Sequence, residues 1–183
     1  PERNYPQFLT DEALKDLFAI FKLSKAKSLF FGFNSRGSWA SINHLHFQGI
    51  YYPETQDLPA ELAIEKAALR EISNVSGVKV SELTDYPARA LVFESEREDD
   101  LITVTLDFVQ LLQTQDIPHT LIIKPDKIYV VPRSRMRGDL CAGGVGFMEI
   151  AGEIYKGTRD ELDSLTEQQI SEELSIATLD GAK

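Results

Sequence analysis

Cysteine is nearly absent from this sequence, which has one cysteine, Cys141, among 183 residues. An intrachain disulfide and a four-cysteine zinc site are therefore excluded. Positive charge is also scarce, because 19 lysine and arginine residues face 29 aspartate and glutamate residues, for a formal net charge of −10. Proteins that bind duplex nucleic acid need a basic surface, so we expect no nucleic-acid partner.

Long apolar runs are lacking as well. The longest, near residues 101–112, is interrupted by threonine, aspartate and glutamine, and it falls short of the ~18 residues needed to cross a bilayer. We expect no membrane span. No signal peptide is evident, and the chain begins with Pro1 rather than Met. We therefore expect a processed product or a fragment that resides in the cytoplasm, or in an organelle if a targeting segment was removed before Pro1.

What is present is a mixture of helix and strand signals. Leu14, Leu17, Phe18 and Phe21 follow Thr10 at the spacing of one helical face, with Thr10 as the N-cap. By the same kind of argument we predict further helices from residue 99 and from residue 159 to about 176, and strands over residues 28–33, 42–52, 89–94, 119–123, 128–131 and 147–155. Residues 60–72 fit either a helix or an extended linker.

This order of elements predicts an α+β fold with a mixed, mainly antiparallel sheet and flanking helices, rather than a doubly wound parallel sheet. We expect residues 1–57 to carry the motif described next and residues 58–183 to form a second α+β half. The two halves would pack as a single compact unit, and they are candidates for two related half-units.

Two of the three histidines lie close together, in the run Ser-Ile-Asn-His-Leu-His-Phe-Gln at residues 41–48. On a strand, alternate side chains share a face, so His44, His46 and Gln48 would point the same way. Ser41 and the turn residues before it add hydroxyl and backbone N–H donors suited to an anion. The sequence thus predicts one face with two imidazoles and a carboxamide beside an anion-binding turn.

Three interpretations of this face compete. It could be a pair of surface histidines, or a metal site completed by His119 or a distant carboxylate. It could also hold a nucleophilic histidine, because neutral imidazole attacks phosphorus readily at neutral pH. The motif itself lacks carboxylates and the chain has one cysteine, so we expect no metal.

A cluster of arginines follows the last strand of the predicted pair, at Arg133, Arg135 and Arg137. We expect this cluster to lie in a solvated loop, with phosphate binding as the alternative.

The motif resembles the transferase branch of the histidine-triad superfamily, and within it the GDP-L-galactose and GDP-D-glucose phosphorylase family. The likeness rests on His-x-His-x-Gln and on the residues before it, at 34–37 and 40–43. It continues in the same order through residues 75–79, 83–89, 91–94 and 149–152, so it spans nearly the whole chain.

The resemblance implies an activity. Such enzymes split a GDP-hexose with inorganic phosphate into GDP and a hexose 1-phosphate, through a covalent nucleotidyl-histidine and without a cofactor. It implies that His46 is the nucleophile and that His44 orients the site and contacts phosphate. It implies that Gln48, Ser41 and Asn34 bind the phosphates. The implied partners are a nucleotide-sugar, inorganic phosphate, and a second chain that supplies N-terminal strands found in relatives.

Two alternatives follow from the same likeness. The chain could be a truncated, inactive family member that serves as a structural or interaction subunit of a larger assembly. It could also keep the chemistry but act on another substrate, as dinucleoside polyphosphate phosphorylases and hexose-1-phosphate uridylyltransferases do.

Overall fold

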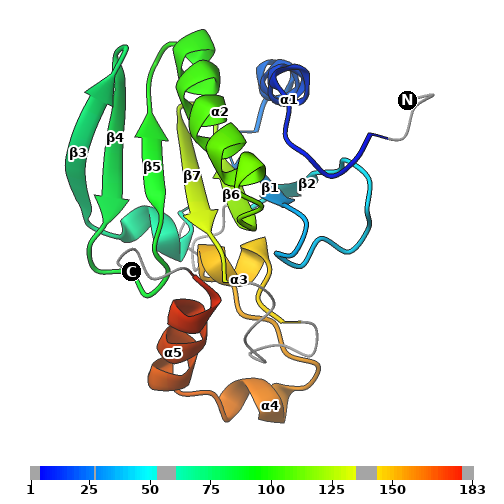
Figure 1. The fold of residues 1–183 in the computed structure, drawn as a ribbon. Coiled ribbons are helices and arrows are strands. Elements are labelled where there is room, and N and C mark those ends of the chain that lie inside the picture. The colour runs from blue at the N-terminus through cyan, green and yellow to red at the C-terminus, as the bar shows by residue number, and fades with distance from the viewer. Residues whose placement is uncertain (1–4, 27, 53–60, 135–143, 179–183) are drawn as a thin grey trace.

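The protein is built around one antiparallel sheet (Figure 1). The computed structural model describes residues 5–26, 28–52, 61–134 and 144–178. In these residues the strands are β1 (Leu29–Asn34), β2 (Gln48–Tyr51), β3 (Leu69–Val75), β4 (Val78–Leu83), β5 (Leu91–Glu94), β6 (His119–Ile123) and β7 (Lys127–Pro132). They lie in the order β2-β1-β6-β7-β5-β4-β3, and each neighbouring pair is antiparallel. The predicted α+β class with a mainly antiparallel sheet is confirmed.

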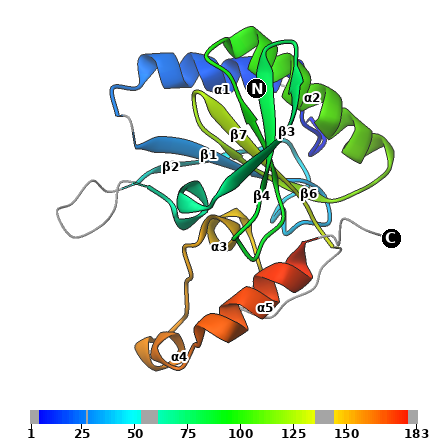
Figure 2. The same cartoon turned by 90° about the vertical axis from the view of Figure 1, so that its left-hand side faces the viewer.

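Helices lie on both sides of this sheet, as Figure 2 shows. They are α1 (Asp11–Leu23), α2 (Glu98–Thr114), α3 (Phe147–Ala151), α4 (Arg159–Asp163) and α5 (Glu167–Ala177), with a 3-10 helix, η1, at Ala63–Lys66. The helices α1 and α2 cover one face of the sheet, and α3, α4 and α5 lie beyond the other. None of the helices in the described part of the chain is both long and apolar enough to cross a membrane.

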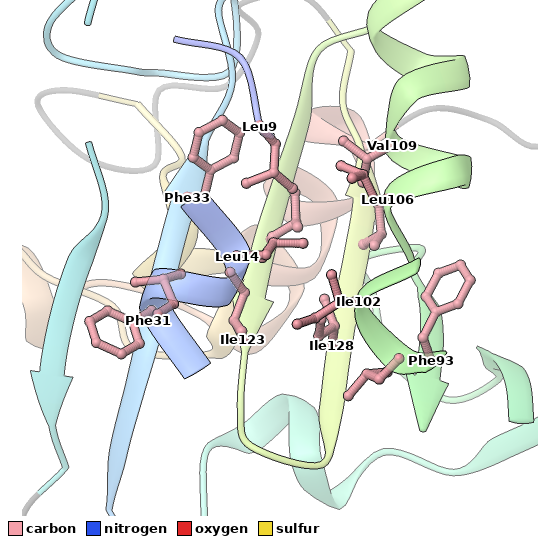
Figure 3. Close-up of a cluster of buried hydrophobic side chains, with 14 of the residues drawn as sticks. Leu9, Leu14, Phe31, Phe33, Phe93, Ile102, Leu106, Val109, Ile123 and Ile128 are labelled. Atoms are coloured by element: carbon pink, nitrogen blue, oxygen red, sulfur yellow. The ribbon is translucent and has the colours of Figure 1, made fainter. Parts of the chain in front are cut away.

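The alternation of β1 explains why the sheet is covered on both faces. Phe31 and Phe33 pack with α1 and α2 in one buried cluster (Figure 3), whereas Phe30 belongs to a second cluster with Phe147. All six residues of this strand are buried. Because successive side chains of a strand point to opposite faces, a strand that is buried along its whole length needs partners on both sides.

The first helix forms as its sequence predicts. The Thr10 hydroxyl accepts a hydrogen bond from the Ala13 N–H at 3.2 Å, which satisfies one of the donors left open at a helix start. The segment before it is tied to α2, where the Gln113 side chain accepts from Leu9 N at 2.7 Å and donates to Leu9 O at 3.3 Å.

The strand predicted at residues 147–155 is wrong, because this segment begins with the helix α3. Glu149 accepts a hydrogen bond from Gly146 N at 2.8 Å and so caps the helix start. Gly32 of β1 makes room for the helix, because a Cβ atom there would lie 2.1 Å from the Phe147 ring. Packing against a distant glycine is not visible in local periodicity.

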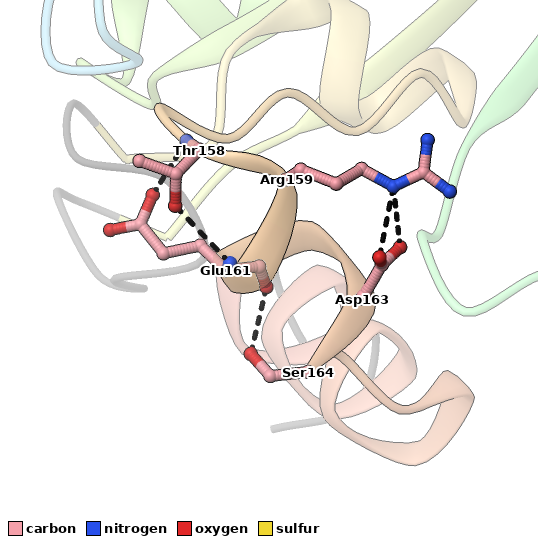
Figure 4. Close-up of polar contacts among 5 residues, drawn as sticks. All are labelled: Thr158, Arg159, Glu161, Asp163 and Ser164. Carbon is pink, nitrogen blue, oxygen red and sulfur yellow. Dashed lines mark hydrogen bonds and ion pairs between the residues drawn. The ribbon is translucent and has the colours of Figure 1, made fainter.

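The predicted C-terminal helix is divided into two. Thr158 and Glu161 form a capping box at the start of α4 (Figure 4). That helix ends at Asp163, and a second box formed by Thr166 and Gln169 begins α5. The spacing of Thr166 and Gln169 is the signal that predicts the break.

Residues 61–72, the described part of the segment 60–72, form neither alternative as a whole. Within them lies η1, and β3 begins at Leu69 and turns back into β4. Ser76 and Gly77 both have positive φ, 52° and 85°, as a tight two-residue hairpin requires. The predicted boundary between residues 57 and 58 lies outside the described residues.

Candidate active site

A cavity of about 640 Å³ opens where β1 and β2 approach α3. Its wall on the β1–β2 side is Asn34, Trp39, Ala40, Ser41, Gln48 and Ile50. Its opposite wall is Gly144, Gly146, Phe147, Met148, Glu149 and Tyr155. The cavity therefore joins residues that lie about one hundred positions apart in the sequence.

Three of the predicted phosphate-binding residues, Asn34, Ser41 and Gln48, line this cavity together. The register of the sheet explains two of them. Gln48 lies opposite Gly32, and Asn34 follows Gly32 by two residues on the same strand. Side chains at opposite and at alternate positions share a face of an antiparallel sheet. Both amides consequently face α3.

The predicted strand over residues 42–52 is wrong in its first half. The strand β2 begins at Gln48, and residues 41–47 are irregular. The backbone there finds partners in the N-terminal segment instead of β1, because Leu45 N donates to Tyr5 O at 2.7 Å and His46 N donates to Gln7 Oε1 at 3.0 Å. His44 and His46 are therefore not held on one strand face with Gln48, and neither is among the residues that line the cavity.

The His46 ring is nevertheless fixed by two acceptors. Its Nδ1 lies 2.9 Å from the backbone oxygen of His44 and 3.1 Å from Gln7 Oε1. A carbonyl oxygen only accepts, so Nδ1 carries the proton in the neutral ring and Nε2 carries the lone pair. The His44 ring is exposed, with its centroid 6.1 Å from that of His46. His46 thus has the tautomer that a nucleophile acting through Nε2 needs.

Gln7 was not singled out by any sequence pattern, yet it joins the histidine to the cavity wall. Its side chain is fully buried, and its Nε2 donates to Asn34 O at 2.8 Å and to His46 O at 3.4 Å. One amide therefore holds both the backbone of a cavity residue and the backbone and ring of His46.

Arg133 corrects another expectation, since it is buried rather than part of a solvated loop. Its Nε donates to Ala177 O at 2.9 Å, its Nη1 to Thr120 Oγ1 at 2.9 Å, and its Nη2 to Val145 O at 2.6 Å. Burial lowers the pKa of Arg133 to about 10, and nearby Glu149 opposes this shift. Arg135, Arg137 and Cys141 lie outside the described residues.

His119 does not join the other two histidines as a metal ligand would. It is buried at the start of β6, where its Nδ1 lies 2.9 Å from Ile117 O and its ring packs against Phe33. In the part of the chain that the structure describes, no group of three or more histidine, cysteine, aspartate or glutamate residues is placed to hold a metal ion.

Comparison with solved structures defines the class of fold. The chain is similar to yeast Ap4A phosphorylase Apa2 in complex with Ap4A, with a TM-score of 0.70 over 96% of this chain and 66% of that one, at 18% identity. The same protein in complex with AMP gives a TM-score of 0.68. The chain therefore shares the α+β fold of that protein.

Comparison with family models identifies the family. Residues 63–183 match the GDPGP1-like C-terminal domain, and residues 1–50 match the GDPGP1-like N-terminal domain. The chain belongs to the GDPGP1-like family, as the motif and its neighbours predict.

Among curated proteins the chain is 36% identical to GDP-L-galactose phosphorylase 1 of Arabidopsis thaliana over 134 aligned residues. This alignment covers 70% of this chain and 28% of that protein. It is 27% identical over 191 residues to GDP-D-glucose phosphorylase 1 of Danio rerio, and that alignment covers 94% of this chain and 53% of that protein. It is 28% identical over 190 residues to the Homo sapiens protein of the same name, and that alignment covers 91% of this chain and 47% of that protein. The chain thus spans from about a quarter to about half of these relatives.

Proposed function

We propose that this chain carries the nucleotidyl-transfer centre of a GDP-hexose phosphorylase, with His46 as the nucleophile. The observation that supports this most directly is the hydrogen bonding of the His46 ring. Because Nδ1 is held by the His44 carbonyl and Gln7, the lone pair lies on Nε2. The names of the curated relatives supply the substrate class, a GDP-hexose.

The reaction consists of two displacements at one phosphorus atom. In the first, His46 Nε2 attacks the α-phosphorus of the GDP-hexose, the bond from that phosphorus to the bridging oxygen breaks, and hexose 1-phosphate leaves. In the second, an oxygen of inorganic phosphate attacks the same phosphorus, the bond to Nε2 breaks, and GDP leaves. The proton stays on Nδ1 throughout, where the His44 carbonyl stabilises the positive charge that the ring gains.

The cavity amides and hydroxyl have a shared role in this scheme. Asn34, Ser41 and Gln48 line one wall, and their N–H and O–H groups would donate to the phosphoryl oxygens on which charge develops. An amide cannot take a proton from water. Gln48 therefore favours transfer to phosphate over hydrolysis of the intermediate.

Intact-mass measurement after mixing the chain with GDP-glucose, in the absence of phosphate, tests the proposal. We expect a mass gain of one guanylyl group, which disappears with release of GDP when phosphate is added. His46→Asn is expected to gain no mass. An unmodified wild-type chain would instead support the interaction-subunit alternative. Parallel incubation with a UDP-hexose and with a dinucleoside tetraphosphate ranks the substrates.

Gln7→Ala is expected to slow formation of this adduct by about tenfold, because it removes an acceptor from His46 Nδ1 and loosens the backbone of the motif. The matched control is Gln113→Ala, which also frees the N-terminal segment, because the Gln113 side chain is hydrogen-bonded to the backbone of Leu9 rather than to that of His46. Both changes should lower the free energy of unfolding by about 1–3 kcal/mol. Rapid-quench mass spectrometry measures the rate, and equal slowing by the two variants would contradict a specific role for Gln7.

A further inference from the structure

A chain of hydrogen bonds runs from the buried Arg133 to the cavity. The Arg133 side chain is 1% exposed, and a guanidinium is costly to bury. Its Nη1 donates to the hydroxyl of Thr120, which is itself fully buried. The Thr120 hydroxyl in turn contacts Asn34 Oδ1 at 2.8 Å. Thr120 and Asn34 are paired directly across β1 and β6, so the sheet register fixes this contact.

The direction of each bond follows from chemistry. A guanidinium has donors and no acceptor, so Thr120 Oγ1 must accept from Arg133 and point its own proton at Asn34. The oxygen of the Asn34 amide is then occupied, and its Nδ2 must lie on the other side. That side is the cavity, because Asn34 lines it and a Cβ atom placed on Gly146, in the opposite wall, would lie 3.7 Å from Asn34 Nδ2.

We infer that Arg133 and Thr120 are positioning residues that hold the Asn34 amide with its N–H donors facing the cavity, ready for the phosphate groups of a nucleoside diphosphate. The inference rests on the proposed function for the identity of this ligand. Hydrogen bonds in a chain polarise one another, so the buried cation strengthens Asn34 as a donor while remaining out of contact with the ligand. Without these hydrogen bonds from Thr120 and Arg133, the Asn34 amide could rotate and present its oxygen to the cavity, where the oxygen would repel an anion.

Isothermal titration calorimetry with GDP tests this inference. Thr120→Val keeps the shape of the side chain and removes the hydroxyl, and we expect it to weaken GDP binding by about tenfold. Thr120→Ser keeps the hydroxyl and should bind within about twofold of the wild type. Thr120→Ala repeats the loss of the hydroxyl with a smaller side chain, so the result does not depend on how one variant folds. Unchanged affinity in both Thr120→Val and Thr120→Ala would overturn the inference, as would a wild-type chain that does not bind GDP.

A double-mutant cycle separates positioning from a general structural role. If Thr120 acts through Asn34, Asn34→Ala should weaken GDP binding by about tenfold, and adding Thr120→Val should weaken it no further. If the losses of GDP affinity in the two single variants instead multiply in the double variant, Thr120 acts by a route other than Asn34 and the inference is overturned. Failure of the proposed covalent chemistry is recognised separately, because the wild type would then bind GDP with this coupling and gain no guanylyl group.

Discussion

Replacing His46 with asparagine is expected to lower the rate of GDP release from a GDP-hexose and phosphate by about 10⁴-fold or more. The asparagine nitrogen has no available lone pair, so the first displacement loses its nucleophile. The smaller amide can still reach the acceptors that hold Nδ1 in the wild type, Gln7 Oε1 and the His44 carbonyl. We therefore expect the fold to be kept while the chemistry is lost.

His44→Asn is the matched control for this prediction. The His44 group that holds the His46 ring is the backbone oxygen, which the substitution leaves in place. We expect a smaller loss, of about 10- to 100-fold, from the missing ring. Chromatographic measurement of GDP over time, together with thermal unfolding of each variant, separates chemistry from folding. A His46→Asn chain that turns over as fast as His44→Asn would exclude His46 as the nucleophile.

Acidification is expected to destabilise the protein through His119 by about 3 kcal/mol between pH 7 and pH 4. Burial lowers the pKa of His119 to about 4, from an ordinary value of about 6.5 in the unfolded chain. Below pH 6.5 the unfolded state therefore binds a proton that the folded state does not, and the equilibrium shifts toward unfolding. The stability that the protein owes to a neutral, buried His119 is fully present at neutral pH, and it is lost as the pH falls toward 4.

His119→Phe provides the comparison for this effect. The wild-type ring packs against Phe33 with centroids 6.1 Å apart, and its Nε2 is buried without a hydrogen-bond partner in the described structure. A phenyl ring fits that surrounding and does not titrate. Urea unfolding at a series of pH values should give a steeper loss of stability for the wild type than for the variant. If the free energy of unfolding falls equally with pH in the two proteins, His119 is not the source of the pH dependence.

The sequence predicts the elements whose signals are local. The N-cap and apolar face of α1, the helix α2 and the hairpin of β6 and β7 all depend on residues within a few positions of one another. The capping box at Thr158 and Glu161 does so as well. The Thr166–Gln169 box and the Ser-Gly turn between β3 and β4 are local signals of the same kind, although the predicted elements do not include them.

The structure brings some of the candidate site residues together and separates others. Asn34, Ser41 and Gln48 line one cavity, but the histidines are not held beside Gln48 by a strand. That expectation placed residues 42–52 on one strand, whereas the backbone N–H groups of Leu45 and His46 donate to Tyr5 and Gln7 in the N-terminal segment. The roles of these residues in phosphate binding and catalysis stay predictions.

By itself the sequence determined the fold class, the family and the residue types of the motif, because periodicity, caps and motif spacing are written in neighbouring residues. The tertiary structure alone decided that Gln7 holds His46, 39 positions away, and that Arg133 is buried against Ala177, 44 positions away. It also decided that Phe147 begins a helix opposite Gly32. Hydrogen bonds and close packing between distant residues exist only once the chain has folded, so no local pattern encodes them.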